Sequence, residues 1–151
     1  ISPAKCWPLL LKQLLVQLLL LTAVACHAQD GISSIILQPS ADLSEQLVAE
    51  IDILFVYDSG VLTQLPFTQF EWVSDRDTYI DQFGADMDVL QFSVTHDSLP
   101  INIDLPERAA SAAAIVVYSS HEDPVAEAVD ISYEADVLLV VEAYGINVVP
   151  N

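Results

Sequence analysis

The first 28 residues of this 151-residue chain are mostly apolar and carry no acidic side chain, unlike the residues that follow. The folded domain must therefore come from the rest of the chain. Lys5 gives the first part a positive charge, residues 9–25 are almost wholly apolar, and Cys26-His27-Ala28 follows. A charged start, an apolar middle and an exit of small residues are the pattern of a secretory signal. The apolar run is broken by Lys12 and is shorter than a membrane span of roughly 20 apolar residues. We therefore predict an export signal at 1–28 and a single folded domain at 29–151.

Two exits from this signal are consistent with the residues. The tetrapeptide Ala23-Val24-Ala25-Cys26 forms a lipobox-like motif, which would make Cys26 the lipidated N-terminus. The other exit is cleavage after Ala28. The chain has two cysteines, and Cys6 leaves with the signal, so Cys26 is the only cysteine that can remain. A lone cysteine in an exported protein needs an explanation, and lipid attachment supplies one. Under either exit the mature domain can form no disulfide.

The mature part is very acidic. All 22 acidic residues follow position 26, and only Arg76 and Arg108 oppose them, which gives a net charge of about −20. Nucleic-acid binding is excluded, because a phosphate backbone must be met by lysine and arginine. Anionic lipid headgroups would also be repelled. The acidity suits a solvated surface in a salty habitat, or else a basic partner or calcium.

The part after the signal contains many short β-type segments. Ile51–Tyr57 is rich in β-branched and aromatic residues and predicts a central strand covered on both faces. Ile101–Leu105 alternates apolar and polar residues, so one of its faces should be wet. The other predicted strands are Ser33–Leu37, Val89–Thr95, Ile115–Tyr118, Val137–Glu142 and Ile146–Val149. Strands in tandem with one helix predict a mainly β fold, an Ig-like β-sandwich with one helical insertion. An α/β fold with a mixed sheet is the alternative.

The helix is predicted at about 69–83. Thr68 and Glu71 have the spacing of a capping box, and Phe67 and Trp72 have that of a hydrophobic staple. An apolar face follows at helical spacing, and Gly84 suits the position just after the helix end. The apolar face consists of Trp72, Tyr79, Ile80 and Phe83, and we interpret these side chains as core.

The secondary structure of three other segments can also be predicted from the sequence, with alternatives for two of them. Residues 41–50 are ambiguous between a short helix and a strand. Asp58-Ser59-Gly60 predicts a turn. Residues 125–135 could form a helix after Asp123-Pro124. We favour instead a strand at 130–135, with Ile131 and Tyr133 pointing inward.

A search for reactive motifs identifies no catalytic residue, metal site or cofactor site. His121-Glu122 begins an H-E-x-x-H pattern, but position 125 is valine, so the second zinc ligand is missing. The pairs Asp75/Asp77 and Asp86/Asp88 do not continue into a calcium-binding loop, and solvated charge explains them better. We therefore expect a non-enzymatic protein.

The order of elements is similar to that of a known family. Cys26 precedes the strand Ile51–Tyr57, the helix with Trp72, a hairpin from Leu90 to Leu105 and the strand Ile115–Tyr118. This order resembles the small outer-membrane lipoprotein of type VI secretion systems. The resemblance implies a transthyretin-like β-sandwich, a lipid on Cys26 and a periplasmic partner that belongs to an inner-membrane protein. No binding residue is carried over.

The leading hypothesis is an envelope lipoprotein at the periplasmic face of the outer membrane. It would contact the membrane through its lipid anchor and hold a partner protein, in a secretion-system assembly. One alternative is a soluble periplasmic module that binds calcium or another ligand. A second arises because Ile51–Tyr57 and Gln82–Asp86 are similar to stretches of reprolysin-like secreted metalloproteases. Without the zinc-binding histidines, the chain would be a truncated or inactive relative of that group.

Overall fold

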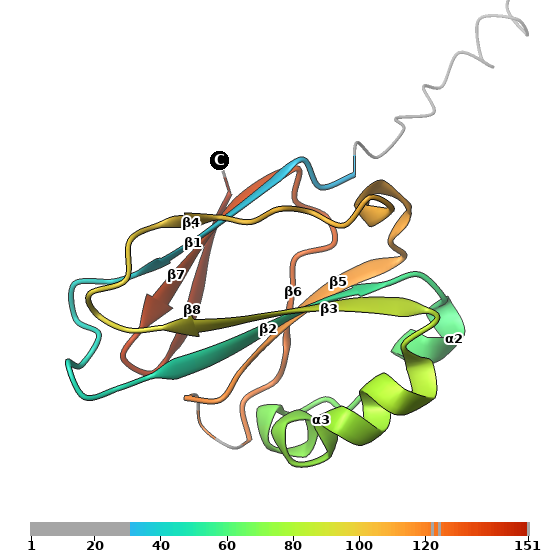
Figure 1. Cartoon of the computed structure of the whole chain (residues 1–151), viewed down its shortest axis with the longest axis horizontal. Coiled ribbons are helices and arrows are strands. Elements are labelled where there is room, and N and C mark those ends of the chain that lie inside the picture. The colour runs from blue at the N-terminus through green and yellow to red at the C-terminus, as the bar shows by residue number, and fades with distance from the viewer. Residues whose placement is uncertain (1–30, 122, 124, 151) are drawn as a thin grey trace, which may run out of the picture.

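The structure is a β-sandwich with a helix packed on its outside (Figure 1). It is a computed structural model and describes residues 31–121, 123 and 125–150. In chain order the elements are β1 Ser34–Pro39, β2 Ala49–Val56, α2 Ser59–Leu62, α3 Gln69–Phe83, β3 Met87–Val94, β4 Ile101–Asn102, the 3₁₀ turn η1 Ala109–Ser111, β5 Ala114–Ser119, β6 Val129–Asp130, β7 Asp136–Glu142 and β8 Gly145–Pro150. The mainly β prediction, with one long helix inserted, is confirmed.

Each layer of the sandwich has four strands. The first sheet has the order β4-β1-β7-β8, and the second has the order β3-β2-β5-β6. All pairs are antiparallel except β1 with β7, which run parallel from Ser34↔Asp136 to Pro39↔Val141. The Ser34 hydroxyl donates to Asp136 Oδ1 at 2.6 Å at the start of this pairing. The first sheet is therefore mixed, yet it belongs to a sandwich and not to the α/β alternative.

Strand β2 is the centre of the second sheet, as its composition predicts. It pairs with β3 on one side and β5 on the other. Glu50 is the only exposed residue of the strand. Its side chains alternate between two apolar layers, because successive residues of a strand point to opposite faces. One layer lies between the sheets and the other lies beneath α3.

The layer between the sheets is almost wholly aliphatic. Strand β7 shows the pattern most clearly, since Val137, Leu139 and Val141 are buried and the residues between them are half-buried. The other principal members of this layer are Ile35, Leu37, Ile51, Ile53, Phe55 and Val117. Burying aliphatic side chains of this size stabilises a fold by roughly 1.5–3 kcal/mol each.

Helix α3 has the predicted bounds of 69–83. Thr68 Oγ1 accepts from the Glu71 backbone N–H, and the Thr68 hydroxyl donates to Glu71 Oε2 at 3.0 Å. The predicted staple is wrong, because Phe67 is 80% exposed while Trp72 is fully buried. Gly84 is the C-cap in a right-handed conformation, so the helix end needs no left-handed residue. Asp75 has non-helical backbone angles, which places a kink within α3.

Two expectations about connections are corrected. Leu90–Leu105 is not a hairpin, because β3 pairs with β2 in the second sheet and β4 pairs with β1 in the first. Only two of the residues from Ile101 to Leu105 are in a strand. The turn predicted at Asp58 instead opens the one-turn helix α2, where Asp58 Oδ1 accepts from the Gly60 backbone N–H at 2.7 Å.

The two ambiguous segments also have definite outcomes. Residues 41–46 form turns, and β2 begins at Ala49. The strand predicted at 130–135 ends at Asp130, and the described residues of 125–135 contain no helix. Ile131 is buried as expected, whereas Tyr133 is 79% exposed. The Asp130 carboxylate accepts from the Ser132 backbone N–H, so the chain turns there and cannot continue the strand.

The predicted signal at 1–28 and its Cys26 lie outside the described residues, and the boundary at 29 stays a prediction. Among the residues described, no helix is long and apolar enough to cross a membrane.

Candidate functional site

Trp72 makes both aromatic and hydrogen-bonding contacts between α3 and the second sheet. It extends from α3 onto the outer face of the second sheet and is fully buried there. Its ring stacks on Tyr118 of β5, with 4.9 Å between ring centroids, and on Tyr79, which lies about two helical turns further along α3, with 5.8 Å between centroids. The prediction that Trp72 belongs to the core is confirmed. This aromatic stack fixes the position of α3 over the sheet.

Asp52 is a carboxylate placed in the middle of this apolar layer. It is 4% exposed, and its Oδ2 accepts from Trp72 Nε1 at 2.7 Å and from Arg76 Nη1 at 3.3 Å. Arg76 also lies 4.0 Å from Asp77. A buried charge is costly unless it is paired and hydrogen-bonded, and Asp52 meets both conditions through one oxygen. Asp52 therefore ties β2 to two successive turns of α3.

Gln69 and Tyr118 close the same region near the start of α3. The Gln69 side chain accepts from the Ser119 backbone N–H and donates to the Glu127 carbonyl. The Tyr118 hydroxyl donates to the Pro66 carbonyl at 2.6 Å. Burial raises the pKa of Tyr118, and the charges of Tyr79 and Glu71 add to this effect. Tyr118 therefore stays neutral at ordinary pH and acts as a structural donor.

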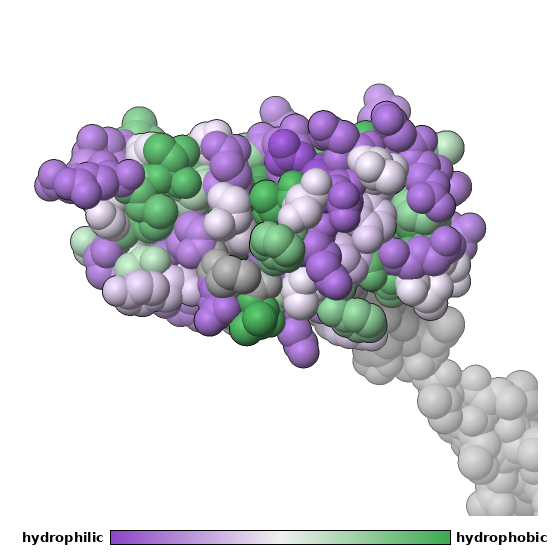
Figure 2. Space-filling model, turned by 90° about the horizontal axis from the view of Figure 1, so that it is seen from below, coloured by the Kyte–Doolittle hydropathy of each residue, from purple (hydrophilic) through white to green (hydrophobic). Residues whose placement is uncertain are grey.

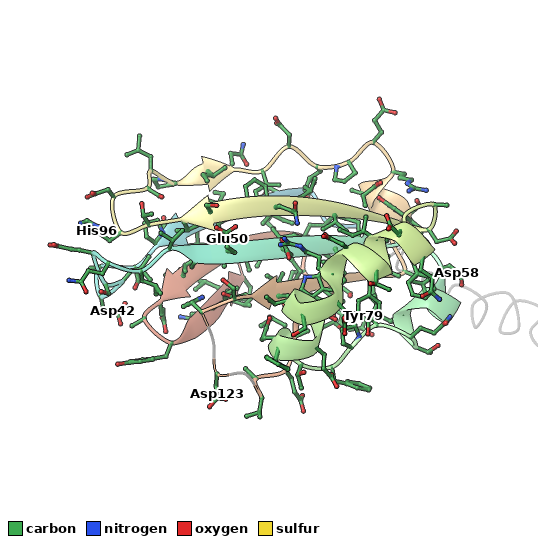
Figure 3. The ribbon with its side chains drawn as sticks, turned by 60° about the horizontal axis from the view of Figure 1, so that its bottom comes forward. Asp42, Glu50, Asp58, Tyr79, His96 and Asp123 are labelled. Carbon is green, nitrogen blue, oxygen red and sulfur yellow. The ribbon has the colours of Figure 1, made fainter. Side chains whose placement is uncertain are left out.

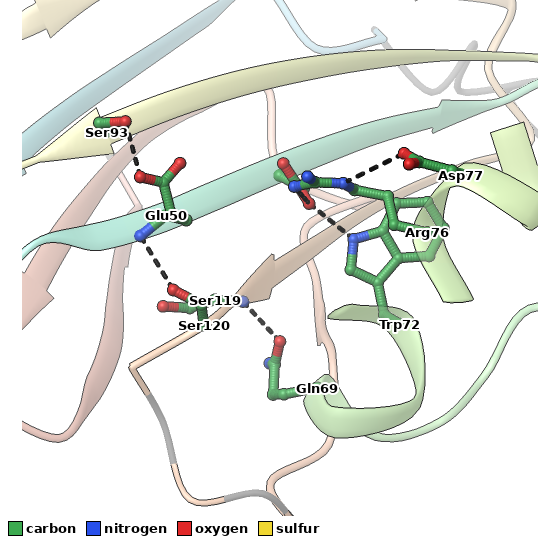
Figure 4. Close-up of polar contacts among 9 residues, drawn as sticks. Glu50, Gln69, Trp72, Arg76, Asp77, Ser93, Ser119 and Ser120 are labelled. Atoms are coloured by element: carbon green, nitrogen blue, oxygen red, sulfur yellow. Dashed lines mark hydrogen bonds and ion pairs between the residues drawn. The ribbon is translucent and has the colours of Figure 1, made fainter. Parts of the chain in front are cut away.

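A pocket opens where α3 leaves the sheet uncovered. It has a volume of about 170 Å³ and lies beside Glu50, Asp52, Val73 and Arg76, with Ser119, Ser120 and Tyr118 completing its wall. Glu50 Oε1 accepts from the Ser93 hydroxyl at 2.9 Å, and the Glu50 backbone N–H donates to Ser120 Oγ at 3.1 Å (Figure 4). Figure 3 shows Glu50 on β2 beside α3 and not beneath it. We call this space the Glu50 pocket.

A second polar cluster joins the far ends of β2 and β3. Asp88 Oδ2 accepts from the Tyr57 hydroxyl at 2.6 Å, and both Asp88 oxygens accept from Arg108 at 3.2 Å. The Arg108 guanidinium also lies over the Tyr57 ring at 3.9 Å. The hydrogen bond from Arg108 lowers the pKa of Asp88, and burial together with Asp88 raises the pKa of Tyr57 to about 12. Asp88 is thus committed to an ion pair, which corrects the expectation that it is solvated.

The two histidines of the described part, His96 and His121, each contact neighbouring polar groups. His121 contacts the Ser119 hydroxyl through Nδ1 and the Glu142 carbonyl at 2.8 Å through Nε2, so both ring nitrogens are engaged. His96 Nε2 lies 2.9 Å from the exposed carboxylate of Asp97. Within 31–121, 123 and 125–150, no three histidine, cysteine, aspartate or glutamate side chains gather as a metal site would require.

The sequence patterns did not predict the contacts of Asp52 and Gln69. Asp52 pairs with Trp72 and Arg76, and Gln69 binds the backbone of Ser119. An aspartate within an apolar strand is a detectable signal, because a buried carboxylate needs a donor. The identity of that donor depends on which face of β2 receives α3, and the sequence pattern does not specify this. The predicted lipid-attachment residue, Cys26, precedes the first described residue, Gly31.

No protein-family model and no curated protein sequence matches the chain. Solved structures do match it. Serratia marcescens Lip, a membrane-bound component of the type VI secretion system, superposes with a TM-score of 0.53 and 12% identity, over 81% of this chain and 99% of that chain. The type VI lipoprotein TssJ1 from Pseudomonas aeruginosa superposes at 0.52 with 11% identity, over 78% and 94% of the two chains.

This chain has the fold of the type VI secretion lipoproteins. A chain in a structure of the type VI protein TssM C-terminal domain from EAEC shares it, with a TM-score of 0.50, 10% identity and coverage of 80% and 99%. The likeness spans nearly the whole of each matched chain. The resemblance inferred from the order of elements is therefore confirmed at the level of the fold.

Proposed function

We propose that this chain is a non-enzymatic lipoprotein of the cell envelope that holds a partner protein within a secretion-system assembly. The observation that carries the proposal is the fold shared with Lip and TssJ1 over more than three quarters of this chain. The buried polar residues of the described part, Asp52, Gln69 and Ser119, form hydrogen bonds that hold α3 against the second sheet. A sandwich whose helix is held in this way can present a fixed surface to a partner protein.

The anchor in this proposal is a lipid on Cys26. The described domain begins at Gly31, only a few residues further along, so a lipid there would keep the sandwich close to the membrane surface. Single lipid chains anchor weakly and stable attachment needs more than one, which a lipidated N-terminal cysteine with several acyl chains would satisfy. With a net charge of about −20, the domain itself gains nothing from anionic headgroups.

Metabolic labelling with palmitate tests the anchor, and the chain offers a matched control in its other cysteine. We expect Cys26→Ala to lose the label and to leave the membrane fraction. Cys6→Ala should keep both, because Cys6 lies within the predicted signal. A Cys26→Ala protein that stays labelled and membrane-bound would refute the anchor. So would a mature protein whose mass shows an unmodified Gln29 at its N-terminus.

The partner in this proposal is the periplasmic part of an inner-membrane protein. Support comes from the structure of the TssM C-terminal domain, in which a chain of the same fold is present. The test is co-elution on gel filtration of the full chain with the periplasmic domain of a TssM-like protein from the same genome. We expect a complex that survives moderate salt. Independent elution at micromolar concentrations of both proteins would contradict the proposal.

A further inference from the structure

We propose that the Glu50 pocket receives a lysine or arginine side chain from an apolar segment of a partner protein. This inference rests on the proposed function, since it supplies a binding site for the partner. The pocket lies between the middle of α3 and the adjoining ends of β2 and β5. Its volume of about 170 Å³ suits one long side chain and is small for a larger organic ligand.

The charges around the pocket favour a cation. Glu50 and Asp52 line it, and Asp77 stands at the outer side of Arg76. Arg76 is the only basic residue that lines the pocket, and it is already paired with Asp52 Oδ2 at 3.3 Å and lies 4.0 Å from Asp77. The carboxylate of Glu50 accepts only from a serine hydroxyl among the described residues and has no cationic partner there. An arriving ammonium or guanidinium group would supply that missing partner.

The burial of Asp52 distinguishes this pocket from an ordinary acidic surface. The residue is 96% buried, yet Oδ2 takes both of its hydrogen bonds, and Oδ1 takes none from the part of the chain that the structure describes. Because no fully buried polar atom in the described part lacks a partner, Oδ1 must retain some access to solvent. Asp52 lines the Glu50 pocket, so a donor that enters there can reach a carboxylate held in place by Trp72 and Arg76.

The rim of the pocket explains why the partner segment should be apolar around its basic residue. Val73 lines the pocket and is 46% exposed, and Phe70 is 62% exposed one helical turn earlier on α3. Figure 2 views the molecule from the α3 side, where hydrophobic groups are set among hydrophilic ones. A second copy of this chain is disfavoured as the occupant, because two domains of charge near −20 repel each other.

The test uses the full chain in detergent micelles and a blocked tripeptide, acetyl-leucyl-lysyl-leucinamide. The reporter is the NMR signal of the indole N–H of Trp72, which donates to Asp52 Oδ2 at 2.7 Å. The other tryptophan, Trp7, lies within the predicted signal, so Trp72 is the only tryptophan in the sequence after position 28. We expect the lysine peptide to shift this signal with saturation, and its norleucine analogue, which has the same length and no charge, to bind at least tenfold more weakly.

Two variants decide the assignment. Glu50→Gln keeps the shape and the Ser93 contact but removes the charge, and should weaken the lysine peptide at least fivefold. Glu107→Gln removes an equal charge at an exposed position far along the chain, and should change the affinity by less than twofold. Equal affinity for the norleucine peptide, equal loss in both variants, or no saturable shift would each overturn the proposal. The palmitate experiment is independent of this pocket, so failure of one does not imply failure of the other.

Discussion

The two faces of the second sheet differ in the kind of interaction that they use. The inner face packs Ile51, Ile53 and Phe55 against the first sheet in a layer without buried charge. The outer face packs Leu54 and Val56 beneath α3, but includes a carboxylate and stacked aromatic rings. Apolar packing is non-directional, whereas hydrogen bonds and ring stacking require defined geometry. The contrast suggests that the inner face provides stability and the outer face fixes the position of α3 and its pocket.

The largest expected effect comes from the inner face. Phe55→Ala should lower the free energy of unfolding by about 3–5 kcal/mol, because it removes a fully buried ring and leaves a cavity. Urea unfolding followed by far-UV circular dichroism measures this loss. The control is Phe67→Ala, which truncates an 80%-exposed ring and should stay within about 0.5 kcal/mol of the parent. A small loss at Phe55 would contradict the stabilising role of the inner face.

The next prediction concerns the hydrogen bond from Trp72 to Asp52 on the outer face. Trp72→Phe keeps an aromatic ring but removes the indole N–H that Asp52 accepts, at a cost of about 1–3 kcal/mol. We expect backbone amides of α3 to exchange faster with solvent, while amides of β1 and β7 keep their protection relative to global unfolding. Uniform acceleration across both sheets would show that the two faces are not separable.

A smaller effect is expected for the charge of Asp52. Asp52→Asn keeps an oxygen that can accept from Trp72 and loses only the ion pair with Arg76, whose side chain is 34% exposed. Because solvent screens such a pair, the free energy of unfolding should fall by about 1 kcal/mol or less. Asp52→Leu removes the acceptor as well and should be more destabilising in the same urea assay. If both variants cost the same, the hydrogen bond to Trp72 does not position the helix.

The smallest effect concerns pH and the Tyr57–Asp88–Arg108 cluster. The pKa of Asp88 is lowered chiefly by its hydrogen bond from Arg108. A carboxyl with a lowered pKa in the fold stabilises it above the unfolded pKa of about 4, and this contribution is lost as the pH falls through the lower, folded value. Asp88→Asn should therefore cost no more than about 1 kcal/mol at pH 6, and the difference from the parent should shrink below pH 4.

Glu107→Gln is the control for this pH dependence, because Glu107 is exposed and makes no hydrogen bond or ion pair within the described residues. Its stability relative to the parent should change little between pH 6 and pH 3. A constant difference between Asp88→Asn and the parent over the same range would show that the ion pair with Arg108 does not contribute to stability.

Local patterns predicted several elements well. Helix α3 follows from a capping residue and helical spacing, and β2 follows from a run of β-branched and aromatic residues, because both depend on neighbours in the sequence. The strand expected at 130–135 failed for a local reason as well. Asp130 bonds the Ser132 backbone and turns the chain, and this side-chain contact competed successfully with the strand propensity of Ile131 and Tyr133.

The sequence patterns did not predict which distant strands pair with each other. The parallel pairing of β1 with β7 joins residues about 100 positions apart, and the passage from β3 to β4 changes sheets where a hairpin was expected. Periodicity shows which face of a strand is apolar, but it does not identify the partner strand. The same limit applies to the Glu50 pocket, whose walls come from β2, α3 and β5.

The sequence by itself determined the strong acidity of the residues after position 28, the strand character of β2 and the bounds of α3. These properties follow from composition and from contacts between close neighbours. Only the tertiary structure decided that α3 lies on the outer face of the second sheet, so that Asp52 meets Trp72 and Arg76. The physical reason is that a buried carboxylate selects its partners by position in space, and that position is set only when the sheets and the helix pack together.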